Sequence, residues 1–492
     1  MTAFAWTDVE VRRALGLGLE GAAEALAFTG ISTDTRQLGG GELYVALVGE
    51  RFDGHDFLAE ALAKGARGAV VSRTAAADAS ATAAQARGAR ASGPHTPSPA
   101  ATADAREARF YTVADTLVAL GALAAHRRVH LVAPVVALTG SSGKTTTKDL
   151  TAAALATTLR VHATRGNLNN RVGVPLTLLA APSDAEAVVL ELGSNEPGEI
   201  RTLAQVARAD VGVVTTVGES HLERLGTLEG VLEEKLDLLR NLSAGGRCVV
   251  GDEPDVLAER ARDVCPRLRV AGWSERADGD LRPSQARPDA SGRYSFRWRG
   301  VSATVPLPGR HAVSDALLAL AVADLLGVPP EEAVRGLATA ETSQMRGQTR
   351  RIGNLSVVVD CYNANPQSVR AALDVLEGQA AATRRVAVLG TMLELGSASE
   401  RLHREVLADA LARDVELIAA TGAFADAARA LGAGDEERVI GAPDWRSAYP
   451  TLRARLAGDE IVLLKASRGV ALEGILALLE RDFSTPGGAA EA

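Results

Sequence analysis

Short apolar runs alternate with longer amphipathic stretches over most of the chain. The first series of expected strands comprises residues 135–139, 187–192 and 211–217. The second series comprises residues 355–360, 386–390, 416–420 and 461–465. Helical periodicity fills the stretches between strands, beginning with residues 144–159. Strands that alternate with helices build βαβ units, so the pattern predicts an α/β protein with two mostly parallel sheets, the second doubly wound.

The two series are separated by a segment of different character. A β-rich stretch at 294–305 is followed by helical periodicity at 313–326 and 330–337. This break predicts that the two parallel sheets belong to separate domains.

Residues 74–106 depart from the pattern, because Ala, Ser, Thr, Pro and Gly dominate them and large apolar residues are few. Such a segment cannot bury enough apolar surface to offset the entropy of ordering it, so we expect it to be disordered. Strand-like runs at 68–72 and 109–113 flank it, which indicates a long insertion inside an N-terminal domain. The small, polar residues 485–492 are expected to fray.

Composition narrows the class of protein. A chain of 492 residues is long enough for about two to four domains. The formal net charge of -8 argues against non-specific nucleic-acid binding. The N-terminal residues have no basic stretch followed by an apolar one, and no apolar run could span a membrane, so we expect a cytoplasmic protein without membrane insertion. Three scattered cysteines, Cys248, Cys265 and Cys361, predict neither a disulfide framework nor a zinc site.

The strongest local signal is a phosphate loop between the strand at 135–139 and the helix at 144–159. Its ATP-binding candidates are Gly140, Ser141, Ser142, Gly143, Lys144, Thr145 and Thr146. Glycines let the backbone N–H groups face an anion, Lys144 can reach the β- and γ-phosphates, and the Thr145 hydroxyl can ligate Mg²⁺. Leu138 replaces the first glycine of the longer loop pattern. The alternative, a plain Gly-Ser turn between strand and helix, is disfavoured because Lys144 and Thr145 follow the glycine. The sequence contains no Asn-Lys-x-Asp string, which disfavours a guanine-specific GTPase.

Acidic and imidazole side chains follow the other strands of the first series. Glu191 closes an apolar strand, where a carboxylate beside a phosphate loop suits Mg²⁺. In isolation, a helix-capping or solvated glutamate is the alternative. His221 follows the next strand, although a lone histidine is more often structural. Lys235 lies on an expected helix, where spacing alone favours a solvated charged face.

A segment rich in amides follows the phosphate-loop helix. Asn167, Asn169 and Asn170 can donate and accept hydrogen bonds, which suits a polar substrate. An ordinary Asn-rich turn explains the same residues about as well. The segment becomes a substrate-binding candidate only together with the motifs that follow.

Short strings along nearly the whole chain, apart from 74–106, together resemble the Mur ligase family. They are TDTR from Thr33, FDGH from Phe52, TGSSGKTT from Thr139, GNLNNRVGVPLTLL from Gly166, ELGSNEPGEI from Glu191, SHLERLGTLEGV from Ser220, LPGRH ending at His311, DCYNANP from Asp360, MLELG from Met392 and LKASRG from Leu464. Within the family, the chain most resembles the branch that joins D-alanyl-D-alanine to UDP-N-acetylmuramoyl tripeptide. The strings that carry this resemblance are GNLNN with GVPLTLL, and YNANP.

The resemblance implies three domains and a reaction. The domains would be an N-terminal α/β UDP-substrate domain at 1–112, a central P-loop ATPase domain at 113–343 and a C-terminal Rossmann-like domain at 344–484. The ligase would phosphorylate the tripeptide's terminal carboxylate with ATP, and D-alanyl-D-alanine would attack the acyl phosphate. This step belongs to peptidoglycan precursor synthesis, and we expect a monomer.

The resemblance also assigns residues. Lys144, His221 and Lys235 are the expected catalytic residues, with Mg²⁺ held by Thr145 and Glu191 and a second ion by His221 and a carbamylated Lys235. The further ATP-binding positions are Asp315, Arg346 and Asp360. The further substrate-binding positions, beside the three asparagines above, are Thr33, Asp34, Arg36, Asn363, Asn365, Ser467 and Arg468.

Four positions depart from the family pattern. Ala312 and Asp315 stand where the family has two asparagines, the second of which contacts adenine; Thr391 and Val359 each replace an aspartate. Asp315 could accept from the adenine amino group but could not donate to a ring nitrogen, which puts adenine recognition partly in question.

Two alternatives follow from these observations. A ligase for a diamino acid or a folylpolyglutamate-type ligase is the near neighbour, but the last domain lacks an Asp-Asn-Pro-Arg-like string. A catalytically silent homologue that binds nucleotide as a regulator or scaffold is the other. The presence of Lys144, Thr145, Glu191, His221 and Lys235 argues against it, because a silent protein does not need them.

Overall fold

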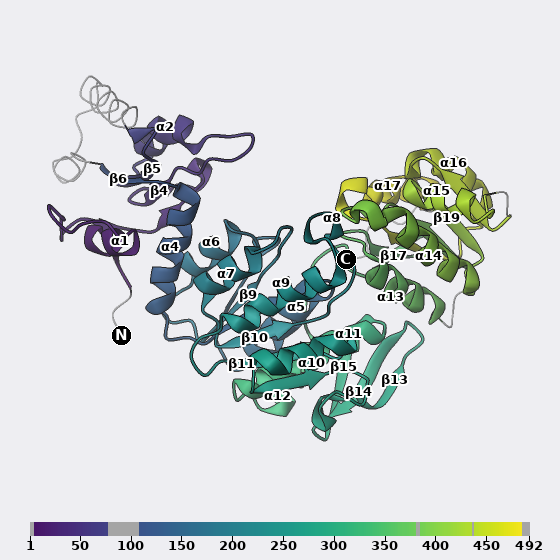
Figure 1. Cartoon of the computed structure of the whole chain (residues 1–492). Coiled ribbons are helices and arrows are strands. Elements are labelled where there is room, and N and C mark those ends of the chain that lie inside the picture. Colours follow the sequence, from purple (N-terminus) through teal and green to yellow (C-terminus); the bar gives the residue numbers. More distant parts are fainter. Residues whose placement is uncertain (1–3, 77–107, 380–383, 435–436, 485–492) are drawn as a thin grey trace. The chain divides into compact units, whose positions relative to one another are not determined.

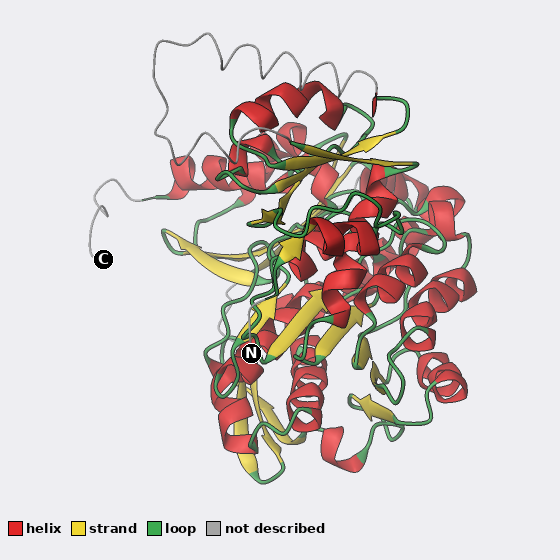
Figure 2. Cartoon of the chain, turned by 90° about the vertical axis from the view of Figure 1, so that its left-hand side faces the viewer, coloured by secondary structure: helices red, strands yellow, loops and turns green. Residues whose placement is uncertain are grey.

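The computed structural model of the chain describes residues 4–76, 108–379, 384–434 and 437–484 (Figure 1). By their internal contacts the residues divide into two compact units. The first comprises 1–135, 162–192 and 202–208, and the second comprises 136–161, 193–201 and 209–492. Helices and strands alternate along the chain in both units. Figure 2 shows the helices in red and the strands in yellow. The predicted α/β class is therefore confirmed.

The first unit contains a four-stranded parallel sheet in the order β3-β4-β5-β6. Its strands are β3 (Ile31–Ser32), β4 (Leu43–Val45), β5 (Gly68–Ser72) and β6 (Arg109–Val113). Successive side chains of a strand point to opposite faces. Leu43 and Val45 therefore share one core with helices α1 (Asp8–Ala14) and α4 (Thr116–Val129), while Tyr44 packs in a second core with α2 (Leu58–Ala63).

Polar caps fix the ends of the two helices on the first core. Strand β1 (Trp6–Thr7) pairs with β2 (Ala27–Phe28), and the Thr7 hydroxyl at its end accepts from Glu10 N to begin α1. Asp115 caps α4 by accepting from the backbone N–H groups of Leu117 and Val118. Such caps satisfy N–H groups that the helix leaves unbonded. The first unit also holds α6 (Gly173–Leu179) and β9 (Ala187–Glu191), beside β8 (Val161–Ala163).

The second unit begins with four parallel strands in the order β12-β11-β10-β7. They are β7 (Val135–Thr139), β10 (Val211–Val214), β11 (Arg247–Gly251) and β12 (Leu268–Ala271). The helices of this region are α5 (Lys144–Ala156), α8 (Leu222–Leu225), α9 (Leu228–Arg240), α10 (Asp255–Val264), α11 (Arg310–Leu325) and α12 (Pro330–Ala338). Helix α7 (Glu199–Ala207) begins in the second unit, and its residues from 202 onward belong to the first. α11 is apolar on nearly every face because it packs against α5, α12 and the sheet.

An antiparallel sheet of three strands separates the two parallel sheets of the second unit, as the β-rich stretch predicted. It consists of β13 (Ser284–Pro288), β14 (Arg293–Trp298) and β15 (Val301–Pro308). Phe296, Trp298, Ala303 and Val305 alternate with exposed polar residues, which is typical of a sheet with one solvated face.

The last sheet has the order β16-β17-β21-β18-β19-β20 and is parallel except for its edge strand β16. Its strands are β16 (Gln348–Ile352), β17 (Leu355–Asp360), β18 (Arg385–Leu389), β19 (Leu417–Thr421), β20 (Val439–Ala442) and β21 (Ile461–Lys465). The helices are α13 (Pro366–Glu377), α14 (Ser399–Ala412), α15 (Ala423–Ala430), α16 (Trp445–Arg455) and α17 (Ile475–Phe483). This is the predicted doubly wound arrangement.

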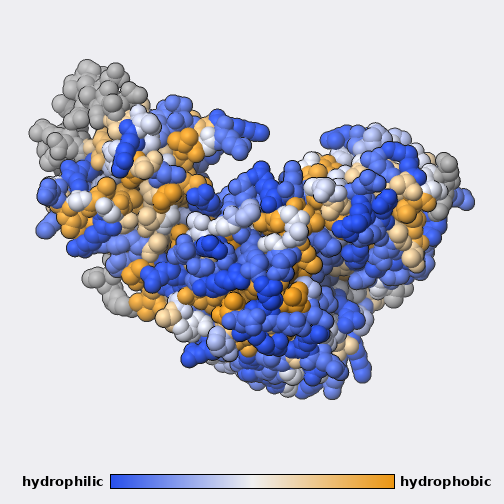
Figure 3. All heavy atoms as spheres, in the orientation of Figure 1, coloured by the Kyte–Doolittle hydropathy of each residue, from blue (hydrophilic) through white to orange (hydrophobic). Residues whose placement is uncertain are grey.

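The apolar strands account for the cores, and the visible face is mostly hydrophilic with scattered hydrophobic patches (Figure 3). Within the described residues, no helix combines the length and the apolarity that a membrane crossing requires. Most of the insertion predicted at 74–106 lies outside the described residues, as does 485–492. Residues 74–76, which are described, continue β5 in a turn held by Ala75 N and the Ser72 carbonyl.

The strand predicted at 211–217 is shorter than expected, because β10 ends at Val214. Thr215 N still donates to the Thr139 carbonyl of β7, but the Thr215 side chain and the Thr216 carbonyl bond the phosphate loop. The Thr215 hydroxyl donates to the Ser142 carbonyl, and Ser141 N donates to the Thr216 carbonyl at 2.9 Å. Thr215 and Thr216 are β-branched and therefore look like part of the strand in the sequence, although their polar atoms hydrogen-bond the phosphate loop.

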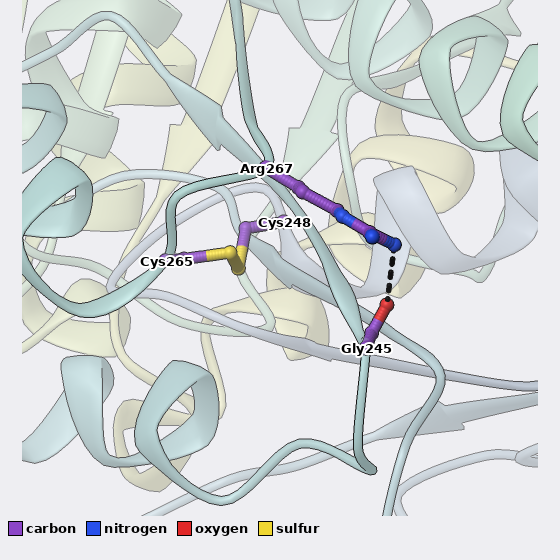
Figure 4. Close-up of a disulfide and its surroundings, with 4 residues drawn as sticks. All are labelled: Gly245, Cys248, Cys265 and Arg267. Atoms are coloured by element: carbon purple, nitrogen blue, oxygen red, sulfur yellow. Dashed lines mark hydrogen bonds between the residues drawn. A yellow bond between two sulfur atoms is a disulfide. The ribbon is translucent and has the colours of Figure 1, made fainter.

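The expectation that the cysteines form no disulfide was wrong. Cys248 on β11 is bonded to Cys265 at the end of α10, with the two Cα atoms 6.4 Å apart (Figure 4). Helix α10 connects β11 to the neighbouring parallel strand β12, so the end of α10 lies beside β11. This brings the two cysteines together although they are 17 positions apart. Sequence spacing carries no signal for such a pair. Cys361 is free and buried.

Candidate functional site

The phosphate loop joins β7 to α5 in the second unit. Gly140 has φ 151° and Gly143 has φ 80°. A Cβ on Gly140 would lie 2.0 Å from the Thr215 hydroxyl oxygen, and one on Gly143 would lie 2.3 Å from Asp315 Oδ1. Both positions therefore need glycine for space as well as for backbone conformation. Lys144 begins α5 and its Nζ donates to the Gly140 carbonyl at 2.6 Å, which folds the ammonium over the loop.

A hydroxyl network connects the loop to the segment that carries His221. Ser141 Oγ donates to the Gly218 carbonyl at 3.1 Å and accepts from Ser220 Oγ at 2.9 Å. His221 follows directly in the left-handed conformation, with φ 53°. Its Nδ1 lies 2.6 Å from Glu394 Oε2. That contact with His221 holds the pKa of Glu394 below its usual value despite burial. Ser220 and Glu394 were not identified as site residues from the sequence.

Lys235 lies on α9 and is 1% exposed, so the solvated charged face was the wrong alternative. Its Nζ donates to Ser194 Oγ at 2.7 Å. Burial, with the neighbouring charge of Lys144, lowers the pKa of Lys235 to about 7, although Glu234 and Glu199 oppose the shift. The amine is therefore partly neutral at physiological pH.

Glu234, the neighbour of Lys235, fixes the start of α7. Its carboxylate accepts from Gly198 N at 2.6 Å and from Ile200 N at 2.8 Å. A carboxylate at the amino end of a helix satisfies unbonded N–H groups and interacts favourably with the helix dipole. Residues 193–201 and α9 are held together by this contact and by the Lys235–Ser194 bond, so Lys235 has a fixed position.

Asp315 lies on α11 beside the loop and is 6% exposed. Its Oδ1 accepts from the Thr147 hydroxyl at 3.1 Å. Burial raises the pKa of Asp315 to about 8, against the opposing effects of Thr147 and Arg346. At neutral pH the carboxyl is therefore mostly protonated and has one O–H to donate, as the family's asparagine has N–H groups.

This pKa predicts that Asp315→Asn stabilises the protein in a pH-dependent way. The folded-state pKa of Asp315 lies above the ordinary aspartate value of 3.8, so the folded state binds the proton more tightly, and stability falls as pH rises from about 4 to about 8. Each pKa unit of displacement changes the free energy of unfolding by about 1.4 kcal/mol, so at pH 8 the raised pKa of Asp315 destabilises the folded protein by on the order of 5 kcal/mol. Asparagine keeps the acceptor for Thr147 and removes this cost.

Thermal unfolding midpoints of both proteins at pH 5 and pH 8 test the prediction. We expect Asp315→Asn to raise the midpoint clearly more at pH 8 than at pH 5. The control is Asp426→Asn, because the Asp426 side chain is 67% exposed and pairs with Arg429 at the surface. An equal shift at both pH values would show that Asp315 is ionised in the folded protein.

The last sheet of the second unit also reaches the phosphate loop. Asn365 caps α13, accepting from Ser368 N at 2.8 Å, while its Nδ2 donates to Ser142 Oγ at 3.1 Å. Lys465, 2% exposed at the end of β21, donates to Asp360 Oδ2 at 2.8 Å and to the Asn363 carbonyl at 2.9 Å. Lys465 was missed from the sequence, although a lysine closing an apolar strand is a usable signal.

The other predicted residues of this sheet lie around the same strand ends. Ser467 Oγ accepts from Leu393 N at 2.9 Å. The guanidinium of Arg346 lies 4.2 Å from the ring centroid of Tyr362, a cation–π distance. Arg468 pairs with Glu473. The structure thus gathers Asp360, Asn363, Asn365 and Ser467 at one edge, as the carboxyl ends of parallel strands require.

The first unit holds the remaining candidates. Glu191, at the end of β9, is 2% exposed, and its carboxylate accepts from Asn169 Nδ2 at 2.8 Å. Within the described residues its Oε2 is buried and has no hydrogen-bond partner. Such an atom is costly unless something else satisfies it. Asn170 instead accepts from Val172 N and Gly173 N at the start of α6, so its carbonyl has a structural role, and Asn167 is exposed.

The TDTR string lies directly after β3. Asp34 accepts from Arg36 N and Nε, both at 2.9 Å. The hydrogen bonds from Arg36 lower the pKa of Asp34 to about 2. The Arg36 side chain is 85% exposed, so Asp34 orients an accessible guanidinium, which suits an anionic ligand. Thr33 precedes this pair.

Three family models match successive parts of the chain. The Mur ligase family catalytic domain matches residues 27–128, the Mur ligase middle domain 138–323, and the Mur ligase glutamate ligase domain 345–468. Three successive matches agree with the expected three-domain architecture.

Relatives cover nearly the whole chain. The UDP-N-acetylmuramoyl-tripeptide--D-alanyl-D-alanine ligase of Bacillus subtilis is 34% identical over 92% of this chain and 93% of its own. Crystal structure I of MurF from Acinetobacter baumannii has a TM-score of 0.82 at 29% identity, covering 98% of this chain and 100% of that one. MurF ligase from Thermotoga maritima in complex with ADP has a TM-score of 0.75 at 26% identity, covering 92% and 97%. With three domain models and full-length relatives in agreement, the chain belongs to the Mur ligase family.

Proposed function

We propose that the protein is an ATP-dependent ligase that joins D-alanyl-D-alanine to UDP-N-acetylmuramoyl tripeptide, a step of peptidoglycan precursor synthesis. The observation that carries the proposal is the phosphate loop, where Asn365 bonds Ser142. Lys235, buried on α9, lies close enough to the loop for the charge of Lys144 to lower its pKa. These are positions that the sequence assigned to one site. Relatives such as the Bacillus subtilis enzyme carry that activity in their names.

The chemistry follows from the weakness of a carboxylate as an electrophile. The carboxylate oxygen of the tripeptide attacks the γ-phosphorus of ATP and ADP leaves, giving an acyl phosphate. The free amine of D-alanyl-D-alanine then adds to the acyl carbon, loses a proton, and phosphate departs as the amide forms. Bringing a carboxylate to a triphosphate requires positive charge, and Lys144 supplies it at the loop.

Mg²⁺ fits the residues proposed for it. Thr145 and Glu191 would hold one ion, because a hydroxyl and a carboxylate are the hard oxygen ligands that Mg²⁺ prefers. The buried Glu191 Oε2, which lacks a hydrogen-bond partner among the described residues, supports this role. His221 and a carbamylated Lys235 would hold a second ion. Bound Mg²⁺ would neutralise charge on the phosphates.

Lys235 fits the carbamate because its amine is buried and its pKa is lowered to about 7 by that burial. A neutral amine attacks carbon dioxide to form a carbamate and releases one proton. The lysine side chain, a cation when protonated, is an anion once carbamylated, and a metal ion would stabilise that anion. Ser194 Oγ, 2.7 Å from Nζ, is placed to hydrogen-bond the group.

We propose that the remaining candidates bind substrate in separate parts of the chain. Thr33, Asp34 and Arg36 would bind the UDP portion, while Asn167, Asn169 and Asn170 would contact the substrate near the metal. Asp315, Arg346 and Asp360 would contact the nucleotide, and Asn363, Ser467 and Arg468 would line the amine-donor side. We further propose domain boundaries at 1–112, 113–343 and 344–484, a monomer, and a cytoplasmic location.

Phosphate release from ATP tests the function. We expect release only with UDP-N-acetylmuramoyl tripeptide and D-alanyl-D-alanine together, because the acyl phosphate needs both an acceptor and an amine. Release with a different amino acid or dipeptide would place the protein in another branch of the family. ATP binding without release under any combination would favour the silent homologue.

A further inference from the structure

A cluster of potential metal ligands lies in the first unit, apart from every residue assigned above. Glu10 comes from α1, and His126 and His130 come from the last turn and the end of α4. One ligand atom from each lies within 4.8 Å of the others. Glu10 Oε2 is already 2.6 Å from His126 Nε2. Histidines four residues apart share one helix face, and this spacing lets two imidazoles reach one ion.

Neighbouring groups orient the three side chains. The Arg13 guanidinium donates to Glu10 Oε1 at 2.6 Å, and the other carboxylate oxygen, Oε2, faces His126. His130 Nδ1 lies 2.9 Å from the His126 carbonyl, so the imidazole donates there and its Nε2 remains as the ligand atom. Secondary contacts that fix the tautomer and direction of a histidine are usual around protein-bound metals.

Aromatic rings partly shield the cluster from water. The ring centroids of Phe4 and His130 lie 4.7 Å apart, and those of Trp6 and His126 lie 6.0 Å apart. The side chains of Glu10 and His126 are 19% and 18% exposed. His130 is exposed, so an ion could enter from solvent on its side.

We propose that Glu10, His126 and His130 form a binding site for a divalent transition-metal ion of the zinc type. Two imidazoles and one carboxylate, with water in the fourth position, are a ligand set that Zn²⁺ accepts, whereas Mg²⁺ and Ca²⁺ prefer oxygen alone. Ligand atoms about 2.0–2.1 Å from a tetrahedral ion lie about 3.3 Å apart. The three ligand atoms lie within 4.8 Å of one another, so small side-chain rotations reach this spacing. The Glu10–His126 pair would open from 2.6 Å, and the exposed His130 has room to move.

The ion would tie α1 to α4. Asp8 in the first turn of α1 already accepts from the Tyr111 hydroxyl of β6 at 2.6 Å, which holds one end of the helix. The metal would hold the opposite face of α1 to α4. Because the site needs both helices folded, binding would stabilise the native first unit in proportion to the free ion concentration.

A zinc titration of the full-length, metal-stripped protein tests the site. Calorimetry should find one more tight Zn²⁺ equivalent in the wild type than in His130→Gln, or at least about 10-fold weaker binding in the variant. Zinc should raise the thermal unfolding midpoint of the wild type more than that of the variant. Zinc that binds at other histidines would bind the wild type and His130→Gln equally, so it would not contribute to the difference between them.

Two further variants sharpen the comparison. Glu10→Gln should lose the same equivalent, although it lies on the other helix. Val129→Gln, at an adjacent position whose side chain is also exposed, should bind zinc as the wild type does. Phosphate release without added zinc should be unchanged in His130→Gln, which shows that the variant is folded. Equal zinc stoichiometry and affinity in wild type and His130→Gln would overturn the proposal and leave a Glu10–His126 ion pair.

Discussion

Lys144→Ala should lower kcat for phosphate release by on the order of 10³ or more. The ammonium of Lys144 lies over the phosphate loop, bonded to the Gly140 carbonyl, where the γ-phosphate would replace part of that contact. Alanine removes the positive charge that the loop itself contributes. The loss concerns charge that develops during phosphoryl transfer, so kcat should fall more than the affinity for ATP. A coupled phosphate assay at saturating substrates gives the number.

The control for Lys144→Ala is Arg404→Ala. Arg404 is a cation on α14 whose side chain is 44% exposed and pairs with Glu400 one turn away, and such surface pairs contribute little. Its activity should match the wild type. The thermal midpoint of Lys144→Ala should change little, because no core contact is lost. Turnover above about a tenth of the wild-type value in a folded Lys144→Ala protein would contradict the phosphate-loop assignment.

The parallel sheets were largely predictable because many of their strands are apolar over most of their length. Residues 355–360 and 461–465 match β17 and β21 at both ends, since a strand buried on both faces is a continuous apolar run. The phosphate loop was predictable for a different reason. Gly140 and Gly143 adopt positive φ angles that other residues rarely adopt, and they precede Lys144 and Thr145 in one short string, so the string itself predicts the loop.

The rest of the site depends on contacts between distant residues. Asn365 before Pro366 is a local signal for a helix start, but nothing in the local sequence indicates that its side chain also bonds Ser142. Ser194 gains its role from its distance to Lys235, on another element. The Cys248–Cys265 disulfide likewise depends on where α10 returns to the sheet. Sequence patterns report local periodicity and turn chemistry, and they do not report which ends of separate elements meet.

The surroundings of Thr391 and Asp315 explain two of the four departures from the family pattern. Thr391 replaces an aspartate, and its Oγ1 accepts from Ala423 N at 3.0 Å at the start of α15, which gives the hydroxyl a structural role. Asp315 replaces an asparagine, but its burial raises its pKa to about 8, so it resembles the neutral amide. Neither departure therefore requires loss of the nucleotide site.

Lys235→Ala should lower kcat by at least about 10²-fold, and Lys235→Arg should do the same. Arginine preserves the positive charge but cannot form a carbamate, so it distinguishes the carbamate from a simple cationic role. The wild type should lose activity when carbon dioxide is removed from the buffer and regain it when bicarbonate is added. Neither variant should respond to bicarbonate. Phosphate release in degassed and bicarbonate-supplemented buffer measures both effects.

The pH dependence provides an independent check on Lys235. Its folded-state pKa of about 7 lies below the ordinary lysine value of 10.5 because the amine is buried, so the reactive neutral form is lost as pH falls below about 7. Bicarbonate should therefore restore activity readily at pH 8 and poorly at pH 6. A carbon-13 carbamate signal after labelling with bicarbonate should appear in the wild type and be absent from Lys235→Arg. A wild type indifferent to carbon dioxide, together with an active Lys235→Arg, would mean that the lysine acts as a buried cation bonded to Ser194.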